Sequence, residues 1–514
     1  MAYYLITDFQ GGLDTRRLTE SARAGSLREL QNGFVNSGGE VQKLQGFVVE
    51  QTLTAALNEA AAAGGWVGPA RTSDGGLVFA GPGSQPSSFP NFVGDTPVYW
   101  SQLSNSLVNP EGLSSADVFG QNVYLVVKYD IYSGYKHFYG QPGQQLTEVL
   151  GEDGNALQDP FVRTIASKVW RASQGALLGY SEVNDPTLTA AAAGGGIIDV
   201  TTAEGAIGPL KGLGVYRNRL AVFGTSGVQI WEVDPDPGPS TTFLTEVIGG
   251  LNVVAGKTIT TYDSGDVLFL TPNGVRSLRA QNVTNNAAVD DIGTPIDDLV
   301  RQAILTGRAD PQGLAALVGE DQSVFSTPPA KNMLGLIEPI TGQYWLAIGG
   351  TIFILSRFRG SNVLAWSMAR LPNAYLGGTD GHIKGAAAAT DRMVICTEDN
   401  TAYLYGGELG LDYDQTPLIV TTPFLDFDDP AAEKSFFALD LVSRGRWKVE
   451  AAFDPQQPDS FEFIGTVEGT TTRMQQISMT GRSTHISLRL TSTDNDTIAT
   501  LSKAAVHFKS GRKV

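Results

Sequence analysis

The run of residues that comes nearest to a known chemical motif ends in Gly256, Lys257 and Thr258. The sequence GGLNVVAGKT resembles a phosphate-binding loop, but that motif requires four residues between its two glycines. The position that should hold the first glycine is Leu251. The TITTY that follows is β-branched and predicts a strand, whereas the motif needs a helix whose amino end faces the phosphates. We therefore predict no nucleotide site and no cofactor.

A second pattern consists of Thr72, Asp74, Gly76 and Phe79, which have the spacing of a turn that recurs in propeller sialidases. That turn is structural, and a glycosidase also needs a paired set of carboxylates or an equivalent nucleophile. Acidic residues are abundant, but no pair is singled out by its spacing. None of the acidic clusters has the spacing of a calcium loop.

Nucleophiles and metal ligands are equally sparse. No serine lies in a Gly-x-Ser-x-Gly turn, and the single cysteine, Cys396, lies in the apolar run MVICT, which predicts a buried side chain. The four histidines are far apart in sequence and lack metal-ligand spacing, so we interpret each as a packed or surface residue; they are His137, His382, His485 and His507. We predict no metal site, no catalytic residue and no enzymatic activity.

Composition restricts the class of protein further. The chain has 514 residues, 36 basic and 53 acidic side chains and a formal net charge of −17. This balance opposes non-specific binding to nucleic acid, which depends on cations that neutralise phosphates. No run reaches the ~18 consecutive apolar residues of a membrane helix, and the amino-terminal residues lack the pattern of an export signal. We expect no membrane anchor and synthesis in a reducing cytoplasm.

A repeat organises most of the chain. Its unit is an apolar strand, a turn rich in Gly, Asn or Asp, and a second apolar strand, and the 60 glycines of the chain supply many of these turns. Successive units, anchored on one apolar or aromatic residue each, are 47, 45, 51, 47, 77 and 50 residues apart; the anchors are Leu77, Tyr124, Val169, Leu220, Val267, Tyr344 and Val394. A period of 40 to 50 residues with hairpin content is typical of four-stranded propeller blades. The alternative is a sandwich or a stack of unrelated hairpins.

The long step contains the clearest predicted helix, TPIDDLVRQAILTG, with Thr294 at the N-cap, Pro295 in the first turn and Gly307 at the end. We also predict helices over 25–32 and 53–63, the second without a strong cap. After about residue 410, longer alternating strands indicate an antiparallel sandwich.

The predicted fold is therefore mostly β, with four domain assignments. Residues 1–50 form an amino-terminal segment that closes the propeller or contacts a partner, and 51–410 form a propeller-like domain of four-stranded blades. A helical insertion covers about 281–340, and 411–514 form a carboxy-terminal β domain.

Two stretches carry a resemblance to a known family. YRNRLAVFGTSGVQIWEV is followed by GKTITTYDSGDVLFLTPNGVRSL and then by the predicted helix, and the opening GSLRELQNGFVNSGGEVQKLQGF has glycine-rich spacing. These stretches resemble the packaged-DNA stabilisation, tail hub or nozzle proteins of short-tailed bacteriophages. The resemblance is best over residues 25–50 and 165–306, and the family has no catalytic signature to transfer.

The resemblance implies a propeller-like subunit of the virion tail, assembled as a homo-hexamer beneath the portal and its tail adaptor ring. Such a ring continues the genome channel, helps to retain packaged DNA, lets it pass during ejection without specific binding, and anchors tail spikes or fibres. An acidic wall would repel phosphates along that path. The candidate lumen or contact positions are Asp234, Asp236, Asp290, Asp291, Asp426, Asp428 and Asp429, and the segment 307–332 is a candidate gate.

Two other interpretations remain open. A propeller that binds or cleaves glycans would use exposed aromatic rings for stacking, and the chain has seven tryptophans: Trp66, Trp100, Trp170, Trp231, Trp345, Trp366 and Trp447. A cellular repeat scaffold is supported by the period alone.

Overall fold

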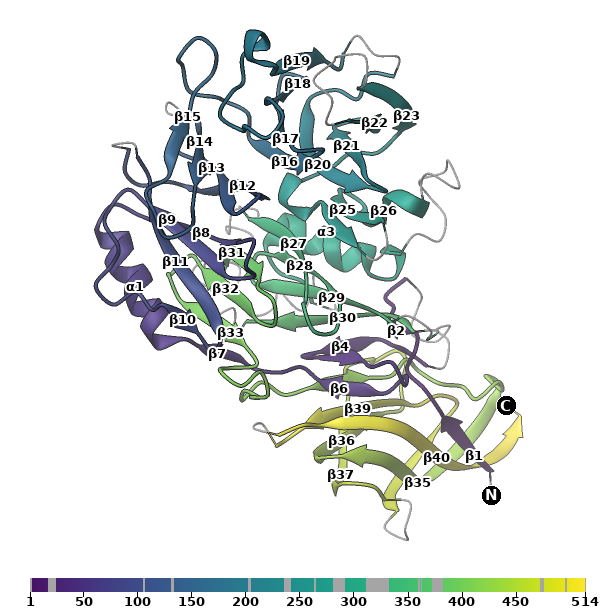
Figure 1. The fold of residues 1–514 in the computed structure, drawn as a ribbon. Helices are drawn as coiled ribbons and strands as arrows, with labels where there is room; N and C mark the ends of the chain where they lie inside the picture. The colour runs from purple at the N-terminus through teal and green to yellow at the C-terminus, as the bar shows by residue number, and fades with distance from the viewer. Residues whose placement is uncertain are drawn as a thin grey trace.

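The computed structural model is a mostly β protein in which blade-like sheets are joined to a two-sheet domain (Figure 1). It describes residues 2–16, 25–104, 107–130, 134–201, 205–234, 242–262, 265–280, 292–310, 332–358, 361, 363–371, 382–471, 476–494 and 497–513. The seven anchors of the sequence repeat fall in seven separate blades, each in the strand next to the innermost one. The predicted fold class is confirmed.

The first blade has the strand order β10-β11-β9-β8, in which β11 pairs with β9 in parallel. The next three blades are regular antiparallel meanders, because each strand pairs with the one that follows it in the chain. The bounds of these strands are β8 Val67–Arg71, β9 Leu77–Gly81, β10 Phe92–Val93, β11 Thr96–Gln102, β12 Gly112–Phe119, β13 Asn122–Lys128, β14 Tyr135–Gly140, β15 Thr147–Val149, β16 Phe161–Ile165, β17 Lys168–Ala172, β18 Leu177–Tyr180, β19 Gly196–Asp199, β20 Leu210–Tyr216, β21 Arg219–Gly224, β22 Gly227–Glu232 and β23 Phe243–Gly249.

The last three blades depart from this regularity. One has three strands within the described residues, one continues into a larger sheet, and one is completed by a strand from the amino-terminal segment. Their strands are β24 Thr260–Tyr262, β25 Asp266–Thr271, β26 Gly274–Ser277, β27 Met333–Ile337, β28 Tyr344–Ile348, β29 Thr351–Arg357, β30 Leu364–Arg370, β31 Ile383–Ala388, β32 Met393–Thr397, β33 Ala402–Tyr405 and β7 Phe47–Val49. Because Met333–Ile337 is a blade strand, the predicted insertion ends before residue 333.

The blades form a closed ring. Their innermost strands contact one another in the cyclic order β8, β12, β16, β20, β24, β27 and β31, and β31 contacts β8 again. The ring is completed where β7 pairs with β33, in the register Val48 to Leu404. The strand from the amino-terminal segment thus joins the first blade to the last.

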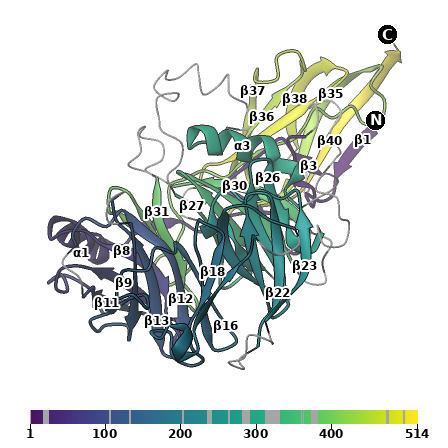
Figure 2. The same cartoon turned by 90° about the horizontal axis from the view of Figure 1, so that it is seen from above.

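The carboxy-terminal domain is a sandwich of two sheets with a common core. One sheet has the order β38-β35-β40-β6-β5, with β1 also paired to β40, and the other contains β4, β34, β39, β36 and β37. Their bounds are β1 Ala2–Ile6, β4 Glu29–Gln31, β5 Gly33–Val35, β6 Val41–Lys43, β34 Ile419–Thr421, β35 Ala432–Arg444, β36 Arg446–Ala452, β37 Glu462–Glu468, β38 Ile477–Ser483, β39 Ser487–Ser492 and β40 Thr500–Lys513. Figure 2 shows this domain at the end of the molecule that is farthest from α1.

The second sheet of the sandwich is continuous with a propeller blade. β4 pairs with β34 and also meets β30 at Met368 and Gln31, so nine strands form one sheet from β27 to β37. The prediction of a helix over 25–32 is wrong. These residues lie between strands that come from far along the chain, and pairing on both sides of β4 overrides their local preference.

A single hydrophobic core extends across this junction. It includes Phe353 and Trp366 from the blade β27–β30, Val300 from α3, and Trp447 and Leu488 from the sandwich. The two parts of the molecule therefore bury their apolar surface together.

Two α-helices lie entirely within the described residues. α1, Gln51–Ala62, confirms the helix predicted over 53–63, and the Glu50 side chain caps it by accepting a hydrogen bond from the Leu53 amide. α3, Asp297–Thr306, ends at Gly307, whose φ of 73° suits glycine. The predicted N-cap is wrong, because Thr294–Ile296 forms a separate 3-10 turn and Ile296 precedes α3 without a side-chain cap.

Four short elements complete the description: β2 Gly12–Leu13, β3 Ser26–Leu27 and the 3-10 turns Ala191–Ala193 and Gly256–Thr258. Within the described ranges, no helix has the length and apolar character needed to cross a bilayer.

Candidate functional site

One cavity of the described structure lies where the innermost blade strands converge. Its volume is about 380 Å³, and it is lined by residues of β8, β12, β16, β20, β27 and β31 and of the Gly256–Thr258 turn. Because each blade contributes its innermost element, the cavity marks the axis of the propeller; we call it the axial cavity. The mouth of a propeller channel is a common position for ligands.

The charged residues of the axial cavity are mostly cationic. Arg71 comes from β8, Arg163 from β16, Lys257 from the 3-10 turn and Lys384 from β31, and Asp117 of β12 is the only anion among the lining residues. The cavity thus carries a formal charge of four minus one, or +3, inside a chain whose net charge is −17.

Asp117 is held by the backbone as well as by a cation. Its Oδ2 atom accepts a hydrogen bond from the Thr164 amide at 2.7 Å and lies 3.6 Å from Nη1 of Arg163, and its Oδ1 atom accepts from the Val118 amide at 2.8 Å. Arg163 Nε is buried and makes no hydrogen bond to any described residue. Asp117 therefore neutralises part of one guanidinium and leaves donor capacity in the cavity.

Lys257 is brought to the cavity by a tight backbone contact. A side chain at the preceding Gly256 would clash with the Lys211 carbonyl oxygen and come within 2.6 Å of the Phe161 ring, so glycine lets the turn pack against β20 and β16. Burial lowers the pKa of Lys257 to about 8, against the opposing attraction of Glu398. No ion pair of Lys257 is formed with the described residues.

Lys384 lies against an aromatic face. Its Nζ atom is 4.0 Å from the centre of the Trp66 ring, at cation–π distance. Burial lowers the pKa of Lys384, and the charge of Glu398 acts in the opposite direction. The lysine is thereby fixed at the wall of the axial cavity without a carboxylate in contact among the described residues.

A second cavity of about 640 Å³ adjoins the first, because both are lined by Leu113, Ser114, Phe161, Gly256 and Lys257.

This adjoining cavity also contains acidic groups. The ammonium of Lys128 forms an ion pair with Glu111, and Glu398 accepts a hydrogen bond from the Asn332 amide at 2.9 Å. When these three charges are included, five cations face three anions, and the combined site is still positive at +2.

None of the acidic positions singled out from the sequence that fall within the described residues lines either cavity. Asp236, Asp290 and Asp291 lie outside the described residues, as do residues 311–331 of the candidate gate. Asp234 is exposed, just after β22.

The remaining acidic positions belong to the loop between β34 and β35. The Asp426 carboxylate accepts from the Asp428 amide at 3.1 Å, and the Asp429 carbonyl accepts from Lys434 Nζ at 2.6 Å. Burial of the ring raises the pKa of Tyr4, and the charges of Asp428 and Asp426 raise it further. This acidic loop therefore lies in the carboxy-terminal domain, next to β1.

The other patterns found in the sequence have structural roles. Asp74 closes the β8–β9 turn by accepting from the Gly76 amide at 3.2 Å and from the Tyr99 hydroxyl at 2.5 Å. His137 is buried between the Tyr124 hydroxyl and the Asp159 carbonyl, and burial lowers its pKa to about 3. Burial raises the pKa of Cys396 to about 12, which keeps it a thiol.

Metal ligands do not gather in the part of the chain that the structure describes. Within those ranges, no three His, Cys, Asp or Glu side chains are grouped so that they could hold a metal ion.

Sequence reasoning missed the cationic cavity. Arg71, Arg163 and Lys384 carry no motif, and only their positions within inner strands distinguish them. Lys257 was noticed, but as part of a failed phosphate loop. Its role in the axial cavity depends on where η3 (Gly256–Thr258) lies in the ring, which the local sequence does not specify.

The comparisons with known proteins identify no family. No family model matches the sequence, and no curated protein matches it. Similar solved structures include the computationally designed Ika8 protein, with a TM-score of 0.33 and 10% identity over 75% of this chain and 85% of that chain. They also include the Pan2 WD40 domain of Neurospora crassa, with a TM-score of 0.32 and 9% identity over 57% of this chain and 74% of that chain. The class defined by the described sheets is a β-propeller joined to a β-sandwich.

Proposed function

We propose that this protein is a non-enzymatic subunit of a short phage tail, a nozzle or hub that continues the channel of the portal and the adaptor. In this proposal six copies form a ring in the virion, help to retain packaged DNA, and offer outer surfaces to tail spikes or fibres. The DNA passes through the ring without specific binding.

One observation carries the proposal. The segments that resemble the nozzle family, 25–50 and 165–306, contain the hairpin β21–β22, the hairpin β25–β26 and the helix α3, in the order that the resemblance implies. The first of these segments also contributes β4 to the sheet that unites the blade and the sandwich, and β7 to the ring closure. A body made continuous in this way suits a component that transmits load within a tail.

The experiment mixes the purified full-length protein with the portal and adaptor rings of the same virus and examines the products by mass photometry and cryo-electron microscopy. We expect a ring of six copies on the adaptor, even if the free protein is monomeric. A protein that associates with neither ring in this mixture would refute the proposal.

The acidic loop offers a sharper test of the channel. If its carboxylates face the DNA path, replacing Asp426, Asp428 and Asp429 by asparagine should increase retention of duplex DNA in the assembled ring, since phosphate repulsion falls. A control with the same charge change replaces Glu152 and Asp153, in the loop before β16, and Asp185, in the loop between β18 and β19, by their amides. Equal retention by both variants would remove the loop from the channel wall.

The alternative of a glycan-binding or glycan-cleaving propeller receives no support from the aromatic residues that suggested it. All seven tryptophans are buried, and the most accessible, Trp231, is only 6% exposed. Incubation with host surface polysaccharide tests this alternative, and depolymerisation that is lost on replacing a single carboxylate would favour it over the nozzle.

A further inference from the structure

We propose that the axial cavity is a binding site for a small polyvalent oxyanion, a molecule that carries phosphate or carboxylate groups with at least two negative charges. This inference does not rest on the proposed tail function. It rests on the residues that the ring closure brings together, which come from positions as distant as Arg71 and Lys384.

The cations of the cavity are carried by strands and a turn of the propeller ring, which place them around one space. Arg71, Arg163 and Lys384 belong to the inner strands β8, β16 and β31, and Lys257 belongs to a turn packed against β16 and β20. Of the four cations that line the axial cavity, Arg163 alone forms an ion pair with a described residue, Asp117. Three further cations thus line one small cavity without a contacting carboxylate among the described residues, and their like charges repel one another.

The dimensions agree with a small ligand. A volume of about 380 Å³ lies at the lower end of the range for small-molecule sites, about 300–1,000 Å³. Arginine offers a planar set of donors that matches phosphate and carboxylate oxygens, and lysine adds a point charge. The free Nε atom of Arg163 supplies a further buried donor. Several donors from opposite walls favour an anion with more than one charged group over a simple monovalent ion.

The lowered pKa values of Lys257 and Lys384 are consistent with a cavity that lacks a counter-charge, because burial is the main cause of both shifts. Glu398 is the alternative source of a counter-charge for these two lysines. Its charge favours the protonated form of both lysines, although it is within ion-pair distance of neither. If Glu398 already satisfies the lysines, the cavity is an internal charge network and needs no ligand.

The test is calorimetric titration of the full-length protein at low salt with pyrophosphate, with citrate and with glucose. We expect saturable binding of pyrophosphate, of citrate or of both, and none of the neutral sugar. The comparison of the two anions distinguishes a phosphate site from a carboxylate site. Absence of saturable binding of either anion at millimolar concentration would overturn the proposal.

Variants connect the binding to the cavity. Lys257→Met and Lys384→Met should each weaken anion binding roughly tenfold, since each removes a charge-assisted contact. Lys257→Arg should retain it. Lys503→Met is the control, because Lys503 is exposed on β40 in the other domain. Binding that survives both cavity variants would place the anion elsewhere and refute the site.

Glu398→Gln separates the two explanations of the cluster. If the cations are a ligand site, removal of the nearby negative charge should strengthen anion binding severalfold while the fold stays intact. If they form an internal network, the same change should leave anion binding absent and lower the unfolding temperature. Circular dichroism on every variant identifies any that fails to fold, and the wild-type and Lys257→Arg titrations then still decide the question.

Discussion

The blades of this propeller are built in two ways. The three meanders from β12 to β23 each use one continuous stretch of chain, and every strand pairs with its neighbour in sequence. The blades β27–β30 and β31–β33 instead join strands from the amino-terminal segment, β4 and β7. Each blade of the first kind is held together by pairing between strands that are consecutive in the chain. The second kind connects the beginning of the chain to strands more than 300 residues away.

This difference concentrates the cooperativity of the molecule in one region. The core that surrounds β30 also contains side chains from α3 and from both sheets of the sandwich. The core between the blades β16–β19 and β20–β23 contains residues of those blades and of the segments next to them. We therefore expect damage in the first region to spread and damage in the second to remain local.

The largest effect should come from Trp366, which is buried in the common core and donates from Nε1 to the Ile292 carbonyl at 2.6 Å. Trp366→Ala should lower the free energy of unfolding by about 3–5 kcal/mol and increase hydrogen exchange in β36 and β39 of the sandwich. The matched variant Trp170→Ala removes a tryptophan that is equally buried in a local blade. Its exchange should increase only in β16–β22, and spread to the sandwich would contradict the distinction.

The next effect concerns ring closure. Val48→Pro in β7 should cost about 3 kcal/mol, because proline disrupts a strand ladder, and should expose β31–β33 and β8 to exchange. Glu148→Pro makes the same change in β15, the outer strand of a local blade. We expect that variant to lose protection from hydrogen exchange at β14 alone. If a urea titration shows the same loss of unfolding free energy in both variants, the distinction between the two kinds of blade is wrong.

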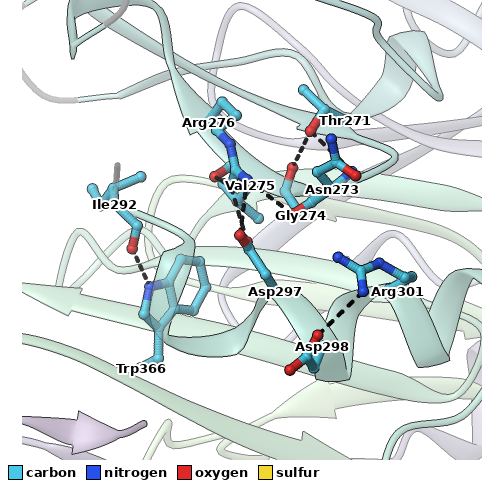
Figure 3. A network of polar contacts seen from close by, with 10 residues as sticks. All are labelled: Thr271, Asn273, Gly274, Val275, Arg276, Ile292, Asp297, Asp298, Arg301 and Trp366. Carbon is cyan, nitrogen blue, oxygen red and sulfur yellow. Dashed lines mark hydrogen bonds and ion pairs between the residues drawn. The ribbon is translucent and has the colours of Figure 1, made fainter. Parts of the chain in front are cut away.

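A smaller effect should come from the ion pair that fastens α3 to its three-stranded blade (Figure 3). Arg276 donates two hydrogen bonds to Asp297, at 2.9 and 2.8 Å, and is nearly buried. Arg276→Met should cost about 2–3 kcal/mol, as expected for a charged hydrogen-bond partner left unpaired. The exposed pair of Arg301 and Asp298 is the control, and Arg301→Met should change the unfolding free energy by less than about 0.5 kcal/mol.

The smallest effect at neutral pH is expected from His137 in a local blade, and this effect grows as the pH falls. His137 has a pKa of about 3 when folded, because it is buried beside the charge of Arg171, against about 6.5 when unfolded. Below pH 6.5 the unfolded chain binds a proton that the folded protein does not, so stability is present above that pH and is lost as the pH falls towards 3. Without this histidine, the free energy of unfolding should fall less steeply as the pH falls. We expect His137→Gln to reduce the slope by up to about 1.4 kcal/mol per pH unit near pH 5. The measurement is a urea titration of both proteins at several pH values. If their unfolding free energies change equally with pH, the histidine does not contribute.

The sequence made the locally built parts of the fold predictable. The seven anchors were recognisable because each blade hairpin repeats an apolar pattern around a turn, and α1 and α3 were visible from their own residues. The parts formed by distant strands were not. Nothing local in Glu29–Gln31 specifies a strand, and its pairing depends on β30 and β34, which follow hundreds of residues later.

For the same physical reason, the axial cavity could not be predicted from the sequence. Each of its cations follows an ordinary strand or turn pattern, and they meet only when the ring closes. The acidic clusters stood out in the sequence because their members are adjacent in the chain. Adjacency in sequence is easy to see, but convergence from separate blades requires the fold.

The pairing of β7 with β33 also determines when the ring can close while the chain is being synthesised. Val48 is made 356 residues before its partner Leu404. At translation rates of about 5–20 residues per second, the wait is on the order of 20–70 seconds. During that interval the earlier blades can form, whereas β7 has no strand to pair with, because β33 has not yet been made. The last blade can be completed only when nearly four-fifths of the chain has emerged, so the ring can close only late in synthesis.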